Sequence, residues 1–170
     1  MTSIQMAMEE PRHPMTVIAF NDPSDIQLSE HFRLSEFTRS AVAIRHDIDN
    51  TPDIEDIEAL QCLCIHVLEP LRKKFGVLKI TSGYRSPMLN AKVRGAQNSQ
   101  HMKGQAADLF VSNNEVARKY YDFIRKNLEY DQLLLEMKTV RGVGYVHCIH
   151  VSYNNEGENR RQAISNYRVK

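Results

Sequence analysis

The chain has 170 residues, of which 42% are hydrophobic and 25% are charged, and its 22 basic and 21 acidic side chains leave a net charge of +1. This length fits one domain with a sizeable core of its own. The balanced charge, without a basic stripe interleaved with aromatic residues, argues against nucleic-acid binding, and no apolar stretch reaches membrane-spanning length.

The N-terminal segment is polar and carries Glu9, Pro11 and Pro14, without the apolar centre of a secretory signal. We therefore expect a cytoplasmic protein, or a phage product that is released to the cell wall by other means. Residues 1–27 show no apolar periodicity and predict an arm or a loosely ordered segment, so we assign the domain to residues 28–170. Three cysteines without paired spacing indicate free thiols in a reducing compartment.

Helical patterns come first along the chain. Short helices are expected within residues 28–41. The clearest helix is predicted to begin with Thr51 as its N-cap and Pro52 in its first turn, because apolar residues then recur at three- to four-residue spacing. Pro70 predicts a kink or a restart before Gly76 ends this helix, because proline lacks the N–H that a helix interior needs.

Strand patterns follow. Residues 77–81 favour a strand that leads into a tight turn, and residues 130–137 and 144–153 favour two strands joined by a glycine-containing hairpin loop. A helix is expected before the hairpin, from Asn113 or Asn114 to Leu128. The pattern predicts a single α+β domain in which helices pack on a small, mostly antiparallel sheet.

One segment combines metal-ligand residue types with small residues. His101 and Asp108 are seven positions apart, and a continuous helix would separate them by roughly 10 Å along its axis. Two ligands of one zinc ion must each lie about 2 Å from it, so the segment must bend if both bind. Gly104 is the natural place for the bend.

A second segment, residues 146–152, favours a strand in which side chains alternate between the two faces. His150 and His147 then point to opposite faces, and a regular strand brings one of them to a site. Two imidazoles and one carboxylate leave a fourth zinc position for water, which is the pattern of a catalytic site.

These motifs resemble those of the M15 family, the zinc D-alanyl-D-alanine carboxypeptidases and related murein endopeptidases. The resemblance covers roughly residues 32–153. It rests on the following runs in this sequence: Ser99-x-His101-x-x-Gly104-x-Ala106-x-Asp108, Ile149-His150-Val151-Ser152, Ile80-Thr81-Ser82-Gly83-Tyr84-Arg85-Ser86-Pro87 with Asn90, Leu68-Glu69-Pro70-Leu71-Arg72, and Asp131-Gln132-Leu133-Leu134.

The resemblance implies a fold of the hedgehog and D-Ala-D-Ala peptidase type, with Zn²⁺ held by His101, Asp108 and His150. It also implies substrate-binding roles for Arg85 and Ser99. An arginine suits such a role, because a guanidinium can donate two parallel hydrogen bonds to a terminal carboxylate, although a loop brace is its alternative role.

The general base departs from the family pattern, because many M15 enzymes have a glutamate shortly before the last histidine ligand and this chain has His147 there. We predict Glu136 as the base, provided that the hairpin register places it near Cys148. His147 is the alternative catalytic residue, as an acid or as a donor to the tetrahedral intermediate, and would need a β-bulge to approach His150.

The sequence therefore predicts a zinc metallopeptidase, expected to be a monomer, that hydrolyses peptidoglycan stem peptides with a metal-activated water. The cleaved bond is either the terminal D-Ala-D-Ala bond or an internal bond such as L-Ala-D-Glu. The alternative is a catalytically inactive, zinc-containing cell-wall-binding or phage structural module.

Overall fold

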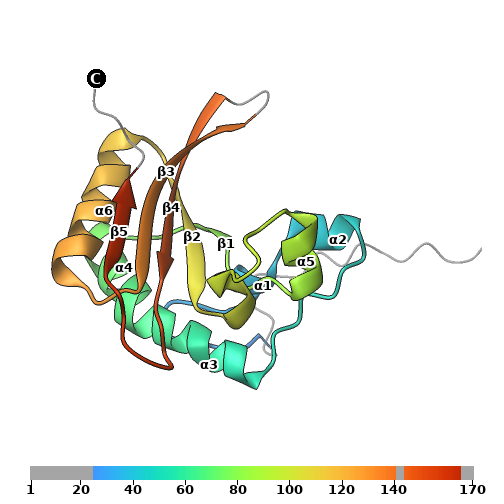
Figure 1. Cartoon of the computed structure of the whole chain (residues 1–170). Coiled ribbons are helices and arrows are strands. Elements are labelled where there is room, and N and C mark those ends of the chain that lie inside the picture. The colour runs from blue at the N-terminus through green and yellow to red at the C-terminus, as the bar shows by residue number, and fades with distance from the viewer. Residues whose placement is uncertain (1–24, 141–143, 166–170) are drawn as a thin grey trace, which may run out of the picture.

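The computed structural model describes residues 25–140 and 144–165, which fold into a five-stranded sheet with helices around it (Figure 1). The strand order is β1-β2-β4-β3-β5. Neighbouring strands are antiparallel except for β3 and β5, which are parallel. This arrangement confirms the predicted α+β class and its mostly antiparallel sheet. Within the described residues, no helix is both long and apolar enough to cross a membrane.

The elements follow in chain order. They are α1 (Leu34–Thr38), α2 (Ala41–Arg45), α3 (Ile54–Leu63), the π-helical turn η1 (Cys64–Leu68), α4 (Glu69–Phe75), β1 (Ile80–Ser82), α5 (Pro87–Lys92), the 3₁₀ turn η2 (Gln100–Lys103), β2 (Ala106–Val111), α6 (Asn114–Asn127), β3 (Gln132–Val140), β4 (Gly144–Ser152) and β5 (Gln162–Ser165).

The two faces of the sheet have different characters, because side chains alternate along each strand. One face is buried against α3, η1, α4 and α6 and forms the core. Its fully or almost fully buried strand residues are Ala107, Leu109, Leu133, Leu135, Ile149 and Val151. The opposite face carries the polar residues of the site, so the helices on the first face act as its support.

The long N-terminal helix begins and breaks for local reasons. Thr51 was predicted as its N-cap, but α3 begins at Ile54 with Asp53 as the cap, because Thr51 donates its hydroxyl and backbone N–H to Asp49 in a turn of its own. A kink or a restart was predicted near Pro70, and the helical run changes its type there without a break. The helix widens into η1, where the Glu69 N–H donates to the Cys64 carbonyl, and α4 starts with Pro70 in its first turn.

The second half agrees with the predicted pattern except at short elements. Helix α6 starts after Asn113, whose side chain accepts from the Val116 N–H, and the hairpin β3–β4 follows as expected. The strand predicted at residues 77–81 begins later, at Ile80. Strands β2 and β5 and helix α5 were not predicted.

The proposed N-terminal arm, residues 1–27, lies outside the described residues except for its last three positions. There, Asp25 accepts hydrogen bonds from the backbone and hydroxyl of Ser35, and Gln27 forms an isolated bridge with Arg33. The hairpin loop, residues 141–143, also lies outside the described residues.

Candidate metal centre

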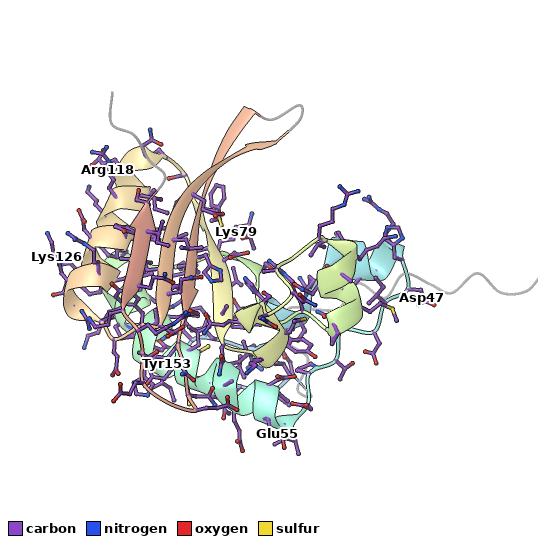
Figure 2. The ribbon with its side chains drawn as sticks, in the orientation of Figure 1. Asp47, Glu55, Lys79, Arg118, Lys126 and Tyr153 are labelled. Atoms are coloured by element: carbon purple, nitrogen blue, oxygen red, sulfur yellow. The ribbon has the colours of Figure 1, made fainter. Side chains whose placement is uncertain are left out.

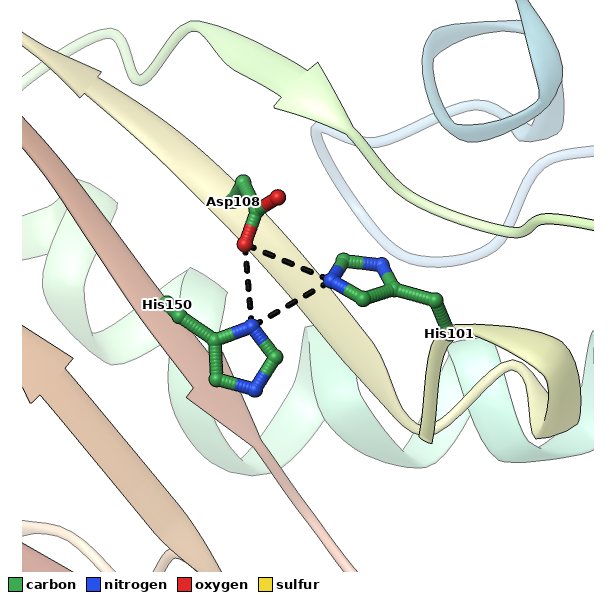
Figure 3. Close-up of side chains that lie close together, drawn as sticks. All are labelled: His101, Asp108 and His150. Carbon is green, nitrogen blue, oxygen red and sulfur yellow. Dashed lines mark hydrogen bonds and ion pairs between the residues drawn. The ribbon is translucent and has the colours of Figure 1, made fainter. Parts of the chain in front are cut away.

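Three elements bring the predicted ligands together (Figure 3). His101 lies in η2, Asp108 in β2 and His150 in β4, where it pairs directly opposite Asp108. The predicted bend between His101 and Asp108 is present. Gly104 ends the 3₁₀ turn in the left-handed conformation, with φ of 63°, and β2 starts two residues later.

The three ligand atoms form a tight triangle. Nε2 of His101 lies 3.2 Å from Nδ1 of His150 and 3.3 Å from Oδ1 of Asp108, and the last two atoms are 2.9 Å apart. Donors that lie about 2.0–2.1 Å from a tetrahedral zinc ion are about 3.3 Å from one another. The spacing of this His–Asp–His group therefore fits a zinc ion, and the group could hold a metal.

His101 is oriented by the backbone. It is 3% exposed, and its Nδ1–H donates to the Gly83 carbonyl at 2.6 Å, which leaves the lone pair of Nε2 facing the site. Burial lowers the pKa of His101 and outweighs the opposing effect of Asp108. The imidazole is therefore held neutral, as a metal ligand must be.

Asp108 is fixed as a carboxylate. Burial alone would raise its pKa, but the interactions with the imidazoles of His101 and His150 hold the pKa far below its usual range. Its Oδ1 faces the two imidazoles, and Oδ2 accepts a hydrogen bond from Nη2 of Arg85 at 2.9 Å. The two oxygens thus have separate partners, which fixes the direction of Oδ1.

Arg85 lies beside the triangle, where it braces Asp108. Its Nε donates to the Ser82 hydroxyl at 2.9 Å, and its backbone N–H donates to the His101 carbonyl at 3.0 Å. Among the described residues, Nη1 makes no hydrogen bond and remains for a further partner. The brace was the alternative role for Arg85 in the sequence, and substrate binding stays a prediction.

Ser99 caps the 3₁₀ turn that carries His101. Its hydroxyl accepts from the His101 N–H at 3.3 Å, and the side chain is partly exposed. This contact positions the first histidine and leaves the hydroxyl accessible, so a substrate contact by Ser99 also stays a prediction.

The two candidate bases lie at different positions of the hairpin. Glu136 pairs with Cys148, the register on which its prediction depended, and Leu134 pairs with His150. Glu136 is therefore on the same sheet face as His150, one strand away and two residues along. His147 pairs with Val111 and Met137, out of phase with His150, and its side chain lies outside the described ones.

Several residues of the site were not predicted individually. Gly83 contributes a backbone carbonyl, for which a sequence has no residue-type signal, although it lies in the tight turn predicted after residues 77–81. Ser82, three residues before Arg85, accepts a hydrogen bond from its guanidinium. Gln100, directly before His101, donates to the buried Asp131 at 3.0 Å, which ties η2 to the start of β3.

A comparison with known families bears on this site. A profile described as Peptidase M15 matches residues 30–148, a stretch that includes His101, Asp108 and Glu136 and ends two residues before His150. The chain belongs to the Peptidase M15 family. No curated protein sequence matches it. M15 peptidases are zinc-dependent metallopeptidases, so this family member has a ligand group of the kind that its family requires.

Proposed function

We propose that this M15 family member is a zinc-dependent peptidase that hydrolyses peptidoglycan stem peptides, with His101, Asp108 and His150 as the zinc ligands. The observation that carries the proposal is the triangle of two imidazole nitrogens and one carboxylate oxygen, in which Gly83 orients His101 and Arg85 orients Asp108. With three protein ligands a tetrahedral ion keeps one open position, which is typical of catalytic sites.

Zinc bound there would supply a Lewis acid that lowers the pKa of water toward about 7 and polarises a peptide carbonyl. The remaining steps fall to the protein. Glu136 accepts a proton from the attacking water and delivers it to the nitrogen of the leaving amine as the C–N bond breaks. Arg85 keeps Asp108 aligned and has Nη1 left for a substrate carboxylate or carbonyl.

The position of Glu136 supports its role as base. Diagonal neighbours on adjacent antiparallel strands have Cβ atoms about 7–8 Å apart, which a glutamate can span toward a site beside His150. The diagonal from Glu136 to His150 has this geometry, and neither residue is fully buried. The partial exposure leaves the pair accessible to a substrate that lies on the open face of the sheet.

The kind of substrate follows from the family resemblance, and the cleaved bond is either D-Ala-D-Ala or an internal bond such as L-Ala-D-Glu. A carboxylate-binding role for Nη1 of Arg85 would favour the terminal bond. We further propose that the protein is monomeric, and that it acts in the cytoplasm or is a phage product released to the wall.

The decisive experiment measures the zinc content of the purified protein and digests purified peptidoglycan with and without a chelator, with the products followed by mass spectrometry. Release of terminal D-Ala, or cleavage within the stem, that stops on chelation supports the proposal and identifies the bond. One zinc per chain with intact peptides would instead favour the inactive wall-binding or phage structural module.

The base is tested by Glu136→Gln, which keeps the shape of the side chain and removes its proton-accepting carboxylate. Hydrolysis should fall by about 10²–10⁴-fold while the zinc content stays unchanged. The matched control is Glu58→Gln on the exposed surface of α3, which should retain full activity. If Glu136→Gln stays active and His147→Ala does not, the role belongs to His147.

A further inference from the structure

A cavity of about 610 Å³, lined mainly by residues with polar or charged side chains, lies next to the metal centre, at the end of the sheet where β2 and β3 begin and β4 ends. Tyr153, which follows β4, marks this end of the sheet (Figure 2). The cavity is lined by residues of η2, of the β3 start and of the segment between β4 and β5. Its polar and charged lining residues include Ser99, Gln100, Lys103, Asp131, Glu156 and Glu158.

The cavity shares η2 with the metal centre. Ser99, Gln100 and Lys103 line the cavity, whereas His101 in the same turn faces the metal ligands. Gln105, another lining residue, is three positions before Asp108, which corresponds to about 10 Å along a strand. A peptide held at the metal centre can therefore place a long neighbouring side chain in the cavity.

The floor of the cavity is a preformed hydrogen-bond network. Asp131 is 2% exposed. Its carboxylate accepts hydrogen bonds from the Gln100 side chain and from both the backbone N–H and the guanidinium of Arg160. These bonds neutralise the Asp131 carboxylate with the Arg160 charge and fix both segments. The Arg160 side chain is exposed, but its guanidinium is paired with Asp131, so the remaining charges of the lining are those of Lys103, Glu156 and Glu158.

The rim carries an excess of negative charge. Glu156 and Glu158 are exposed. Because Arg160 is paired with Asp131, the other cation of the lining is Lys103, whose Nζ is 4.0 Å from Glu156. Asn154 braces the loop that bears both acids, because it accepts from the Glu156 N–H and donates to the Glu158 carbonyl. One carboxylate is thus left without a cationic partner at the mouth of the cavity.

We propose that this cavity is a subsite for the side-chain ammonium of a diamino acid in the peptide substrate, with Glu156 and Glu158 as its recognition residues. The inference rests on the proposed peptidase function and refines it. A stem peptide whose diamino acid keeps a free amine would be preferred over one in which a cross-link has acylated that amine, because acylation removes the charge.

The test compares the binding of three synthetic pentapeptides, L-Ala-D-Glu-L-Xaa-D-Ala-D-Ala, to the zinc-loaded protein by calorimetry. Xaa is lysine, Nε-acetyl-lysine or Nε,Nε-dimethyl-lysine, the last of which adds bulk and keeps the charge. The background is Glu136→Gln, which suppresses turnover during titration. The two charged peptides should bind about 5-fold more tightly than the acetylated one, as expected for an exposed ion pair, and the preference should shrink at high salt.

The double variant Glu156→Gln/Glu158→Gln should reduce this ratio to about one without changing the zinc content. Its matched control is Glu55→Gln/Glu58→Gln on the exposed face of α3, which should keep the ratio. Equal binding of all three peptides, binding of none, or a ratio that survives in the double variant would overturn the subsite.

The two proposals fail separately. Charge-dependent binding without hydrolysis by the parent protein would refute the peptidase function and leave the subsite in place. Hydrolysis of all three peptides without any charge preference would refute the subsite and leave the peptidase function in place.

Discussion

Replacing Gly104 by alanine tests how tightly the metal-ligand turn is packed. A Cβ at this position would lie 2.1 Å from the carbonyl oxygen of Asp56 in α3, well inside the van der Waals contact distance. The neighbour is helix backbone and cannot rotate away, so η2 or α3 must shift. The left-handed conformation adds about 1–2 kcal/mol for a residue with a Cβ, and overpacking adds about 1–3 kcal/mol. We expect Gly104→Ala to lower the free energy of unfolding by about 2–5 kcal/mol.

The shift should also reach the metal centre, because His101 lies three residues before Gly104. Misplacement of a reacting group by about 1 Å can cost on the order of 10²-fold in rate, and we expect hydrolysis to fall accordingly. Unfolding by urea should be measured on chelator-treated protein, since bound metal would itself stabilise the fold. Zinc affinity is measured separately, by competition with a chromogenic chelator.

Two variants separate packing from backbone strain. Gly76→Ala also has a positive φ, of 86°, but no atom lies within 4 Å of the added Cβ, so it should cost about 1–3 kcal/mol and leave zinc affinity unchanged. Gly104→Asn tolerates the left-handed conformation, so it should be as damaging as alanine only if the contact with Asp56 dominates. A Gly104→Ala protein within about 1 kcal/mol of the parent, with unchanged zinc affinity, would refute the reasoning.

Other variants probe the surroundings of the site. Arg85→Lys replaces a guanidinium that bridges Ser82 and Asp108 by a point charge, so zinc affinity should fall by about 10-fold or more, and an unchanged affinity in the chelator competition would contradict the brace. Hydrogen bonds from Arg160 lower the pKa of Asp131 in the folded protein. The ionised carboxylate therefore stabilises the fold fully at any pH above the pKa of the unfolded chain, which is near 3.9. This contribution is lost as the pH falls through the lower pKa of the folded protein. The stability gap between the parent and Asp131→Asn should therefore be about 1–2 kcal/mol at pH 7 and shrink below about pH 4; a gap independent of pH would refute this account. Burial raises the pKa of the Cys64 thiol, so a thiol reagent should modify it only as fast as the protein unfolds, and rapid labelling in native buffer would show that it is accessible.

Local sequence patterns predicted the structure correctly where the conformation depends on residues close in sequence. Asn113 caps α6, Pro70 lies in the first turn of α4 after a π-helical turn, and Gly104 bends the ligand segment, because each residue acts on its own backbone or on a neighbouring turn. The prediction of Thr51 as an N-cap was wrong for a local reason as well. Its hydroxyl donates to Asp49 in a turn that precedes the helix.

Short strands were missed where neighbours decide the conformation. Strand β2 is buried at five of its six positions, so it has no polar alternation to read in the sequence. Strand β5 is four residues long and mostly exposed, and it is a strand because it pairs with β3. Such pairing depends on residues about thirty positions away, which no local pattern contains.

The sequence by itself determined the candidate ligands His101, Asp108 and His150 through its resemblance to the M15 family, and the spacing of the first two showed that the chain between them must bend if both bind one ion. The tertiary structure decided the rest. It placed Nε2 of His101 through the Gly83 carbonyl, committed Arg85 to Asp108 and set Glu136 opposite Cys148. The positions of His101 and Arg85 are fixed by contacts between distant segments, and the position of Glu136 is fixed by strand register. A shift of one residue in that register would turn Glu136 to the other face of the sheet.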